Sequence, residues 1–161
     1  MIYGILKKMM DQPTHSSASG AHPIVSPTHR SAALAPLILI TDDEPYFREI
    51  FSLKLESAGY RVITASSGAD CLEKCVSSHP ALILMDVQMP VLSGIETVMK
   101  LRDIPDMKHT KVIFLTNLGE PKLELQGADR LYARQIGADG YLRKTDDLES
   151  LVEHVRIYLG T

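Results

Sequence analysis

The sequence is poor in the features that mark several classes of protein. It holds only two cysteines, Cys71 and Cys75, which with His79 form a row at helical spacing but leave a four-ligand zinc site incomplete. No apolar run is long enough to span a bilayer, and residues 1–6 are too few for the core of a signal peptide. We therefore expect a cytoplasmic protein that contacts no membrane, with both cysteines as reduced core residues.

The chain also lacks a basic excess. Its formal net charge is -3 over 161 residues, and residues 1–35 carry +2, so that the remainder carries -5. Proteins that bind nucleic acid present a basic face. Direct binding of DNA is therefore not expected.

What is present divides near residue 36. Residues 11–36 are rich in Ser, Ala, His, Pro and Thr and have no apolar period, a composition that cannot bury enough surface to offset the entropy of ordering. We expect residues 1–35 to be a flexible N-terminal extension and residues 36–161 to form one domain.

In this domain, short apolar runs alternate with segments of helical period. Runs that are apolar throughout indicate strands buried on both faces, and their alternation with helices predicts an α/β fold with a parallel sheet between two helical layers. The predicted strands are Leu37–Ile40, Tyr60–Ala65, Ala81–Met85, Val112–Leu115 and Gly140–Leu142. The predicted helices begin at Pro45, about Ser67, near Ser93, within Glu120–Ile136 (ending at Gly137), and at a cap formed by Asp146 or Thr145.

Polar residues stand where four of these strands end. Asp42 and Asp43 follow the first run, Asp86 follows the third, Thr116 closes the fourth, and Lys144 comes just after the fifth. The carboxyl ends of parallel strands meet at one edge, where open α/β sheets bind ligands. We therefore expect these five side chains to converge.

Three clustered carboxylates repel one another, and a divalent cation resolves the conflict. The candidate ligands are all oxygen atoms, so a hard ion is indicated. Mg²⁺ fits best, because it binds few carboxylates and keeps water ligands that a phosphate oxygen can replace. A lysine charge and a threonine hydroxyl complete a set suited to a phosphoryl group.

At this point a family resemblance is plain. Residues 38–45 (ILITDDEP), residues 86–90 (DVQMP) with Gly94, residues 115–116 (LT) and residues 137–144 (GADGYLRK) resemble the motifs of receiver domains of two-component response regulators. The likeness is to single-domain regulators of the chemotaxis type, and it runs to residue 160. It implies a flavodoxin-like (βα)5 fold with strand order 2-1-3-4-5.

The resemblance also implies roles. Asp86 would accept a phosphoryl group from the phosphohistidine of a sensor histidine kinase or a histidine phosphotransfer protein. Mg²⁺ would be held by Asp43, Asp86 and the Gln88 carbonyl, and by Asp42 through water.

Further roles concern the phosphate and the output. Lys144 would pair with the phosphate, Thr116 would turn to hydrogen-bond it, and Tyr141 would follow, switching the surface of the fourth helix, fifth strand and fifth helix. Such a protein is not an enzyme but a phosphoacceptor that catalyses its own phosphotransfer and loses the group slowly. The residues do not specify the downstream protein.

Three positions depart from the family pattern. Thr145 follows the lysine where a proline is usual, and Asn117 follows the threonine where a very small residue is usual, at the rim of the phosphate site. The stretch Gly119–Gly127 is longer than in common members. Asn117 should hinder small phosphodonors and hydrolytic water, which predicts a long-lived phosphorylated state.

Two other readings stay open. One is a pseudo-receiver, a binding module without phosphorylation, although the losses of acid or lysine that mark it are not seen. The other is a receiver fragment of a larger regulator. A Mg²⁺-dependent phosphatase is disfavoured, because Gln88 stands where such enzymes commonly carry a general acid.

Overall fold

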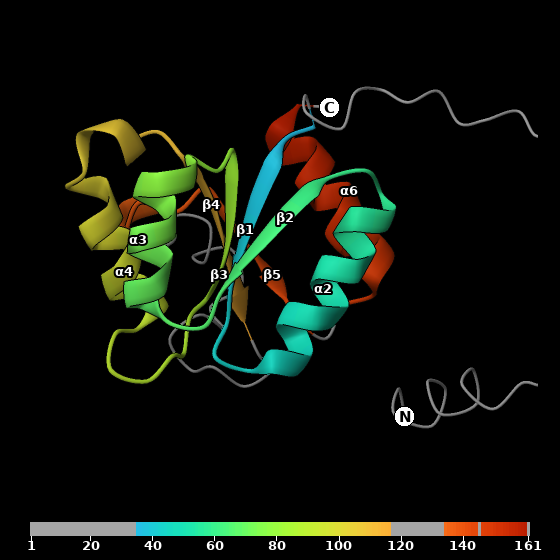
Figure 1. Ribbon diagram of the computed structural model, residues 1–161, viewed down its shortest axis with the longest axis horizontal. Coiled ribbons are helices and arrows are strands. Elements are labelled where there is room, and N and C mark those ends of the chain that lie inside the picture. The colour runs from blue at the N-terminus through green and yellow to red at the C-terminus, as the bar shows by residue number, and fades with distance from the viewer. Residues whose placement is uncertain (1–34, 117–133, 145, 161) are drawn as a thin grey trace, which may run out of the picture.

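One parallel sheet with helices on both faces organises the chain (Figure 1). The computed structural model describes residues 35–116, 134–144 and 146–160. In these ranges no helix has both the length and the apolar character needed to cross a membrane. The strands are β1 (Leu37–Thr41), β2 (Arg61–Ala65), β3 (Leu82–Asp86), β4 (Lys111–Thr116) and β5 (Gly140–Arg143). Their order is β2-β1-β3-β4-β5, which confirms the predicted flavodoxin-like topology.

Four α-helices within the described ranges cover the sheet in two pairs. They are α2 (Pro45–Ser57), α3 (Gly68–Ser78), α4 (Gly94–Arg102) and α6 (Leu148–Leu159), and a short 3-10 helix, η2 (Pro105–Met107), follows α4. In Figure 1, α3 and α4 lie on one face of the sheet, and α2 and α6 lie on the other.

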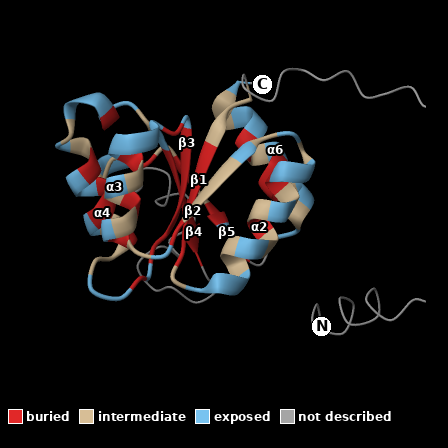
Figure 2. Cartoon of the chain, viewed as in Figure 1, coloured by how far each residue is buried: buried red, intermediate tan, exposed pale blue. Residues whose placement is uncertain are grey.

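The core consists of two apolar layers, one on each face of the sheet. Successive strand residues point to opposite faces, so Leu39 packs with the layer under α3 and α4, whereas Ile38 and Ile40 pack with the layer under α2 and α6. Figure 2 shows the central strands buried and the helices buried along their inner sides. Burial on both faces explains why the strand sequences are apolar throughout.

Most helices begin where the sequence predicts. Pro45 occupies the first turn of α2, and the Ser67 side chain caps α3 by accepting from the Asp70 N–H at 3.2 Å. Ser93 and Glu96 form a reciprocal capping box at the start of α4. These contacts satisfy N–H groups that have no partner within the helix.

The start of α6 differs from the prediction. Its cap is Asp147, whose carboxylate accepts from the Ser150 N–H at 2.9 Å and hydroxyl at 2.8 Å. Asp146 accepts weakly from the Arg143 N–H at 3.4 Å instead, and Thr145 lies outside the described residues. The predicted cap was therefore wrong. Asp146 and Asp147 are both suited to cap a helix, and the path of the backbone after β5 decides which of them does so.

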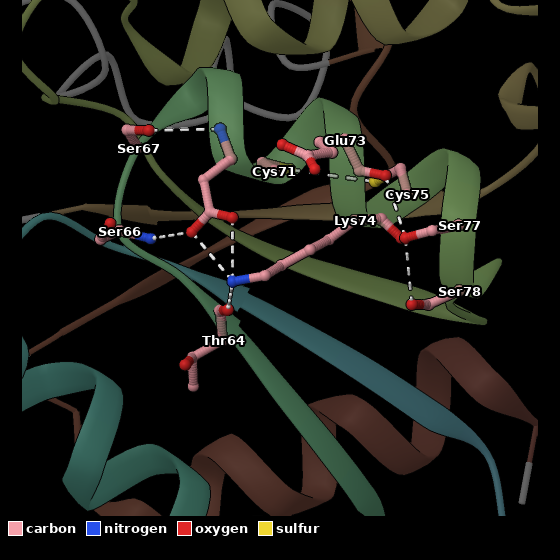
Figure 3. Close-up of polar contacts among 10 residues, drawn as sticks. Thr64, Ser66, Ser67, Cys71, Glu73, Lys74, Cys75, Ser77 and Ser78 are labelled. Carbon is pink, nitrogen blue, oxygen red and sulfur yellow. Dashed lines mark hydrogen bonds and ion pairs between the residues drawn. The ribbon is translucent and has the colours of Figure 1, made fainter.

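Helix α3 carries both cysteines. Cys71 and Cys75 are fully buried and free, with their sulfur atoms 3.9 Å apart, which confirms that they are reduced core residues. On the same helix Lys74 donates to the Thr64 carbonyl of β2 at 2.7 Å and pairs with Asp70 at 2.9 Å (Figure 3). This contact ties α3 to the edge strand.

Arg102 fixes the chain's return into β5 at the edge opposite the polar residues. Its guanidinium donates twice to the Gly137 carbonyl, at 2.8 and 2.6 Å, and once to the Met107 carbonyl at 3.0 Å. Residues 134–135 are helical and Gly137 has φ 91°, which confirms the predicted helix end at Gly137. The rest of that predicted helix lies outside the described residues.

Gly94 begins α4 directly against the last residue of β3. A Cβ atom at this position would lie 2.0 Å from the Asp86 carbonyl oxygen and 3.0 Å from Met85 Cγ. The Gly94 N–H donates to the Val87 carbonyl at 3.0 Å. The absence of a side chain at Gly94 therefore lets α4 approach the end of β3.

We expect Gly94→Ala to lower the free energy of unfolding by about 2 kcal/mol or more, because the new methyl group overlaps backbone atoms that cannot move freely. Urea denaturation measures the change. The control is Gly160→Ala, where φ is 70° and open space surrounds the new Cβ, so only the backbone strain of about 1 kcal/mol is expected. Equal losses in the two variants would contradict the close contact.

Candidate functional site

The predicted polar residues do converge at the carboxyl edge of the sheet. Asp42 and Asp43 follow β1, Asp86 is the last residue of β3, Thr116 is the last residue of β4, and Lys144 follows β5. The strands carrying the acids are neighbours, since β1 pairs directly with β3. Strand order thus places residues that are far apart in the sequence at one point.

Three carboxylates form the centre of the site. One oxygen from each of Asp42, Asp43 and Asp86 lies within 4.8 Å of the others. Asp42 and Asp86 are buried, at 0% and 1% exposure, while Asp43 is half-buried. Asp42 Oδ1 accepts from the Glu44 N–H at 2.9 Å, which restricts rotation of the carboxylate.

The Lys144 ammonium lies among these acids. Its Nζ is 2.8 Å from Asp42 Oδ2 and 3.1 Å from Asp86 Oδ2, and 4.0 Å from Glu44 Oε1. The Asp42 contact is an ion pair without the alignment of a hydrogen bond. The Lys144 side chain is fully buried, so these contacts form away from the screening of water.

Burial and charge shift two pKa values in this cluster. Burial and the neighbouring Asp42 charge raise the pKa of Asp86 to about 7, against the opposing effect of Lys144. Burial alone would lower the pKa of Lys144, but the Asp42 and Asp86 carboxylates outweigh it and raise that pKa. Lys144 is therefore a fixed positive charge, whereas Asp86 exchanges its proton near neutral pH in the metal-free protein.

Three other predicted residues lie around the cluster. The Gln88 N–H donates to Asp86 Oδ1 at 3.3 Å, and the Gln88 side chain is exposed. The Thr116 hydroxyl donates to the Leu142 carbonyl at 3.4 Å and so points along the sheet toward β5. Tyr141 is half-buried and packs against the core layer under α3 and α4.

Some predicted positions fall beyond this description. Asn117, Thr145 and the stretch Gly119–Gly127 lie outside the described residues. The N-terminal extension also lies outside them, apart from residue 35.

The structure adds two residues that the sequence did not single out. The Phe47 ring lies beside Lys144, with Nζ 4.6 Å from the ring centroid. Arg48 donates from Nη1 to the Asp42 carbonyl at 2.6 Å. Both belong to the first turn of α2. The sequence could have indicated them only by their position, a few residues after the end of β1.

An open, parallel sheet with an acidic cluster and a buried lysine at its switch point defines a flavodoxin-like protein with a site for an anionic group. Residues 38–156 match the response regulator receiver domain. The chain therefore belongs to the family of receiver domains of two-component systems. Members of this family are signalling proteins.

Two curated relatives illustrate the range of the family. Over 123 residues the chain is 32% identical to the polar-differentiation response regulator DivK of Brucella ovis, covering 76% of this chain and 95% of that protein. Over 124 residues it is 36% identical to the DNA-binding dual master transcriptional regulator RpaA of Synechocystis, covering 77% of this chain and 49% of that protein.

Solved structures show the same fold. The chemotaxis protein CheY4 of Vibrio cholerae superposes with a TM-score of 0.68 at 29% identity, covering 77% of this chain and 98% of that one. The receiver domain of the sensor histidine kinase PA1611 from Pseudomonas aeruginosa superposes with a TM-score of 0.66 at 25% identity, covering 79% and 99%. That structure has a magnesium ion coordinated in its active site cleft.

The raised pKa of Asp86 predicts how stability depends on pH. The folded, metal-free protein holds this proton up to about pH 7, whereas an unfolded aspartate releases it near pH 4. Stability should therefore fall as pH rises from about 4 to about 7. Asp86→Asn removes this effect, and we expect the variant to exceed the parent by about 4 kcal/mol at pH 8 and to match it at pH 4.

Urea denaturation in excess chelator, at both pH values, measures this difference. Asp106→Asn is the matched control, because Asp106 is an exposed aspartate in η2, far from the cluster in sequence. If Asp86→Asn has the same stability as the parent at pH 8, the unfavourable burial of the Asp86 charge is refuted.

Proposed function

We propose that this chain accepts a phosphoryl group on Asp86 from the phosphohistidine of a sensor histidine kinase or a histidine phosphotransfer protein. The observation that carries the proposal is the buried Asp86 carboxylate at the end of β3, with the Lys144 ammonium 3.1 Å away. An Asp86 oxygen bonds to phosphorus as the phosphorus–nitrogen bond breaks, and the electron pair of that bond stays on the histidine nitrogen.

The residues present fit a magnesium ion, in keeping with the ion in the PA1611 receiver structure. Three carboxylates face one ammonium, so the cluster keeps an excess of negative charge and offers only oxygen ligands. Asp43, Asp86 and the Gln88 carbonyl would hold the ion directly. Asp42 would act through water, because one of its oxygens accepts from Glu44 and the other faces Lys144.

When bound, Mg²⁺ supplies positive charge that offsets the charge on the phosphoryl oxygens. Lys144 supplies the second positive charge and is held in place before the reaction by Asp42. The Thr116 hydroxyl supplies a hydrogen bond once it leaves the Leu142 carbonyl. The existing hydrogen bond from Thr116 to the Leu142 carbonyl is long, at 3.4 Å, so breaking it costs little free energy when the Thr116 side chain rotates.

The proposal extends to the output surface. The backbone of Thr116 accepts from the Lys144 N–H at 2.8 Å, so the end of β4 and the end of β5 move together. Tyr141 lies on β5 and would turn inward behind Thr116. The surface of β5, α6 and the helix that ends at Gly137 would then change shape for a protein partner, and Ile157 on α6 is 64% exposed there.

Phosphorylated Asp86 would persist rather than turn over rapidly. Gln88 carries an amide two residues after the acceptor and cannot donate a proton as a carboxylic acid would. The chain would therefore lose the phosphoryl group slowly by its own catalysis. It would act in the cytoplasm and would not bind DNA directly.

The first test of this function is chemical. Asp86→Asn should abolish acid-labile phosphorylation by a competent phosphohistidine donor, because an amide cannot act as the nucleophile. A panel of phosphorylated histidine kinases and radiolabelled phosphate measure the transfer, with Asp106→Asn as the control that labels normally. Labelling of Asp86→Asn at the parental level would disprove the assignment of the acceptor.

A second test concerns the metal. Below pH 7 the ion must displace the proton from Asp86, so Mg²⁺ affinity should be about tenfold weaker at pH 6 than at pH 8. Calorimetric titration at the two pH values measures this ratio. Asp43→Ala should lose both Mg²⁺ binding and phosphotransfer, and full transfer in excess chelator would contradict the role of the metal.

A further inference from the structure

Phe47 places an aromatic face beside the Lys144 ammonium of the acidic cluster. The Lys144 Nζ lies 4.6 Å from the centroid of the Phe47 ring, within the range of a cation–π contact. The same nitrogen is in ion-pair distance of Asp42 and Asp86. The ammonium is therefore held by carboxylate oxygens and by a ring.

The ring itself is held firmly. Phe47 lies in the first turn of α2, and its centroid is 5.5 Å from that of Tyr46 in an edge-to-face arrangement. On the following turn Phe51, which is 3% exposed, stacks at 5.7 Å with the planes inclined by 36°. Phe47 packs against the core layer that α2 shares with α6, so it cannot easily turn away from Lys144.

The contact with Phe47 offsets the tendency of a lysine ammonium to move toward water. A lysine side chain is a strongly hydrated point charge on a flexible stem, and a nearby opening to water would draw the ammonium away from Asp86. Here the Lys144 side chain has no exposed surface. The Phe47 ring contributes apolar cover together with attraction for the positive charge, which a leucine of similar size would not provide.

We propose that Phe47 is a positioning residue that holds the Lys144 ammonium against Asp86 through its ring face. This inference rests on the proposed function for its consequence, which is faster phosphoryl transfer to Asp86. Its physical content, the contact between ring and ammonium, stands without that function. In this proposal Phe47 acts on the transfer only through Lys144.

Two measurements test the proposal. The first is the ¹H–¹⁵N signal of the Lys144 ammonium in the metal-free protein, which is visible only if the group is shielded from exchange with water, and which Lys144→Met assigns. The second is the rate of labelling by acetyl phosphate, a donor too small to depend on a protein–protein contact. Four variants are compared: Phe47→Leu, Phe47→Tyr, pentafluorophenylalanine at position 47, and Leu55→Val as the matched control, because Leu55 is a buried residue of α2 in the same core layer.

We expect Phe47→Leu to lose the ammonium signal and to label about tenfold more slowly, because a cation–π contact at a half-buried ring lies between the exposed and the desolvated range. Phe47→Tyr should retain both properties. The pentafluorinated ring keeps the shape but reverses the charge of the face, so it should behave like leucine. Leu55→Val should lose stability in the same core layer yet keep the ammonium signal and the labelling rate.

The proposal is overturned if the pentafluorinated protein matches the parent in both measurements, because the ring would then be a spacer. It is also overturned if Leu55→Val loses the ammonium signal as fully as Phe47→Leu does, because the cause would then be loosening of α2. If the parent fails to label with any donor, the proposed function fails, and the ammonium signal in the fluorinated protein alone decides the role of Phe47.

Discussion

A single buried ammonium holds together a group of acids that would otherwise repel one another. Lys144 lies within ion-pair distance of both Asp42 and Asp86, and these two carboxylates are almost wholly removed from water. In such a setting, loss of the ammonium would leave the carboxylate charges uncompensated, which is far costlier than at a surface. The position of each strand end in the site therefore depends on where this ammonium lies.

The sheet makes this arrangement possible and also limits it. Strands covered on both faces must be apolar along their length, so polar chemistry is confined to the residues at their ends. The site concentrates unfavourable charge there, and the two apolar layers of the core offset that cost. Such a division is common in proteins, where a functional cluster lowers stability that the rest of the fold restores.

The sequence was informative where a pattern has one physical solution. Apolar runs predicted the strands and a parallel sheet, and the family resemblance implied the strand order. The polar residues after the strands predicted the cluster, because strand ends share an edge. The cap of α6 was missed since Asp146 and Asp147 both suit the role, and only tertiary contacts choose between them. Phe47 was missed because an aromatic residue in a first turn is ordinarily core, and its relation to Lys144 depends on packing.

The hydrogen bonds from Arg102 to the Gly137 carbonyl have a consequence for how the sequence of this protein can vary. Gly137 is held by two hydrogen bonds from Arg102, and Thr116 is held by its place in β4, so both ends of the intervening sequence are anchored independently of it. The entropy cost of a longer connection between fixed ends grows only slowly with length. Insertions and deletions between these anchors can therefore be tolerated while the acids stay in place.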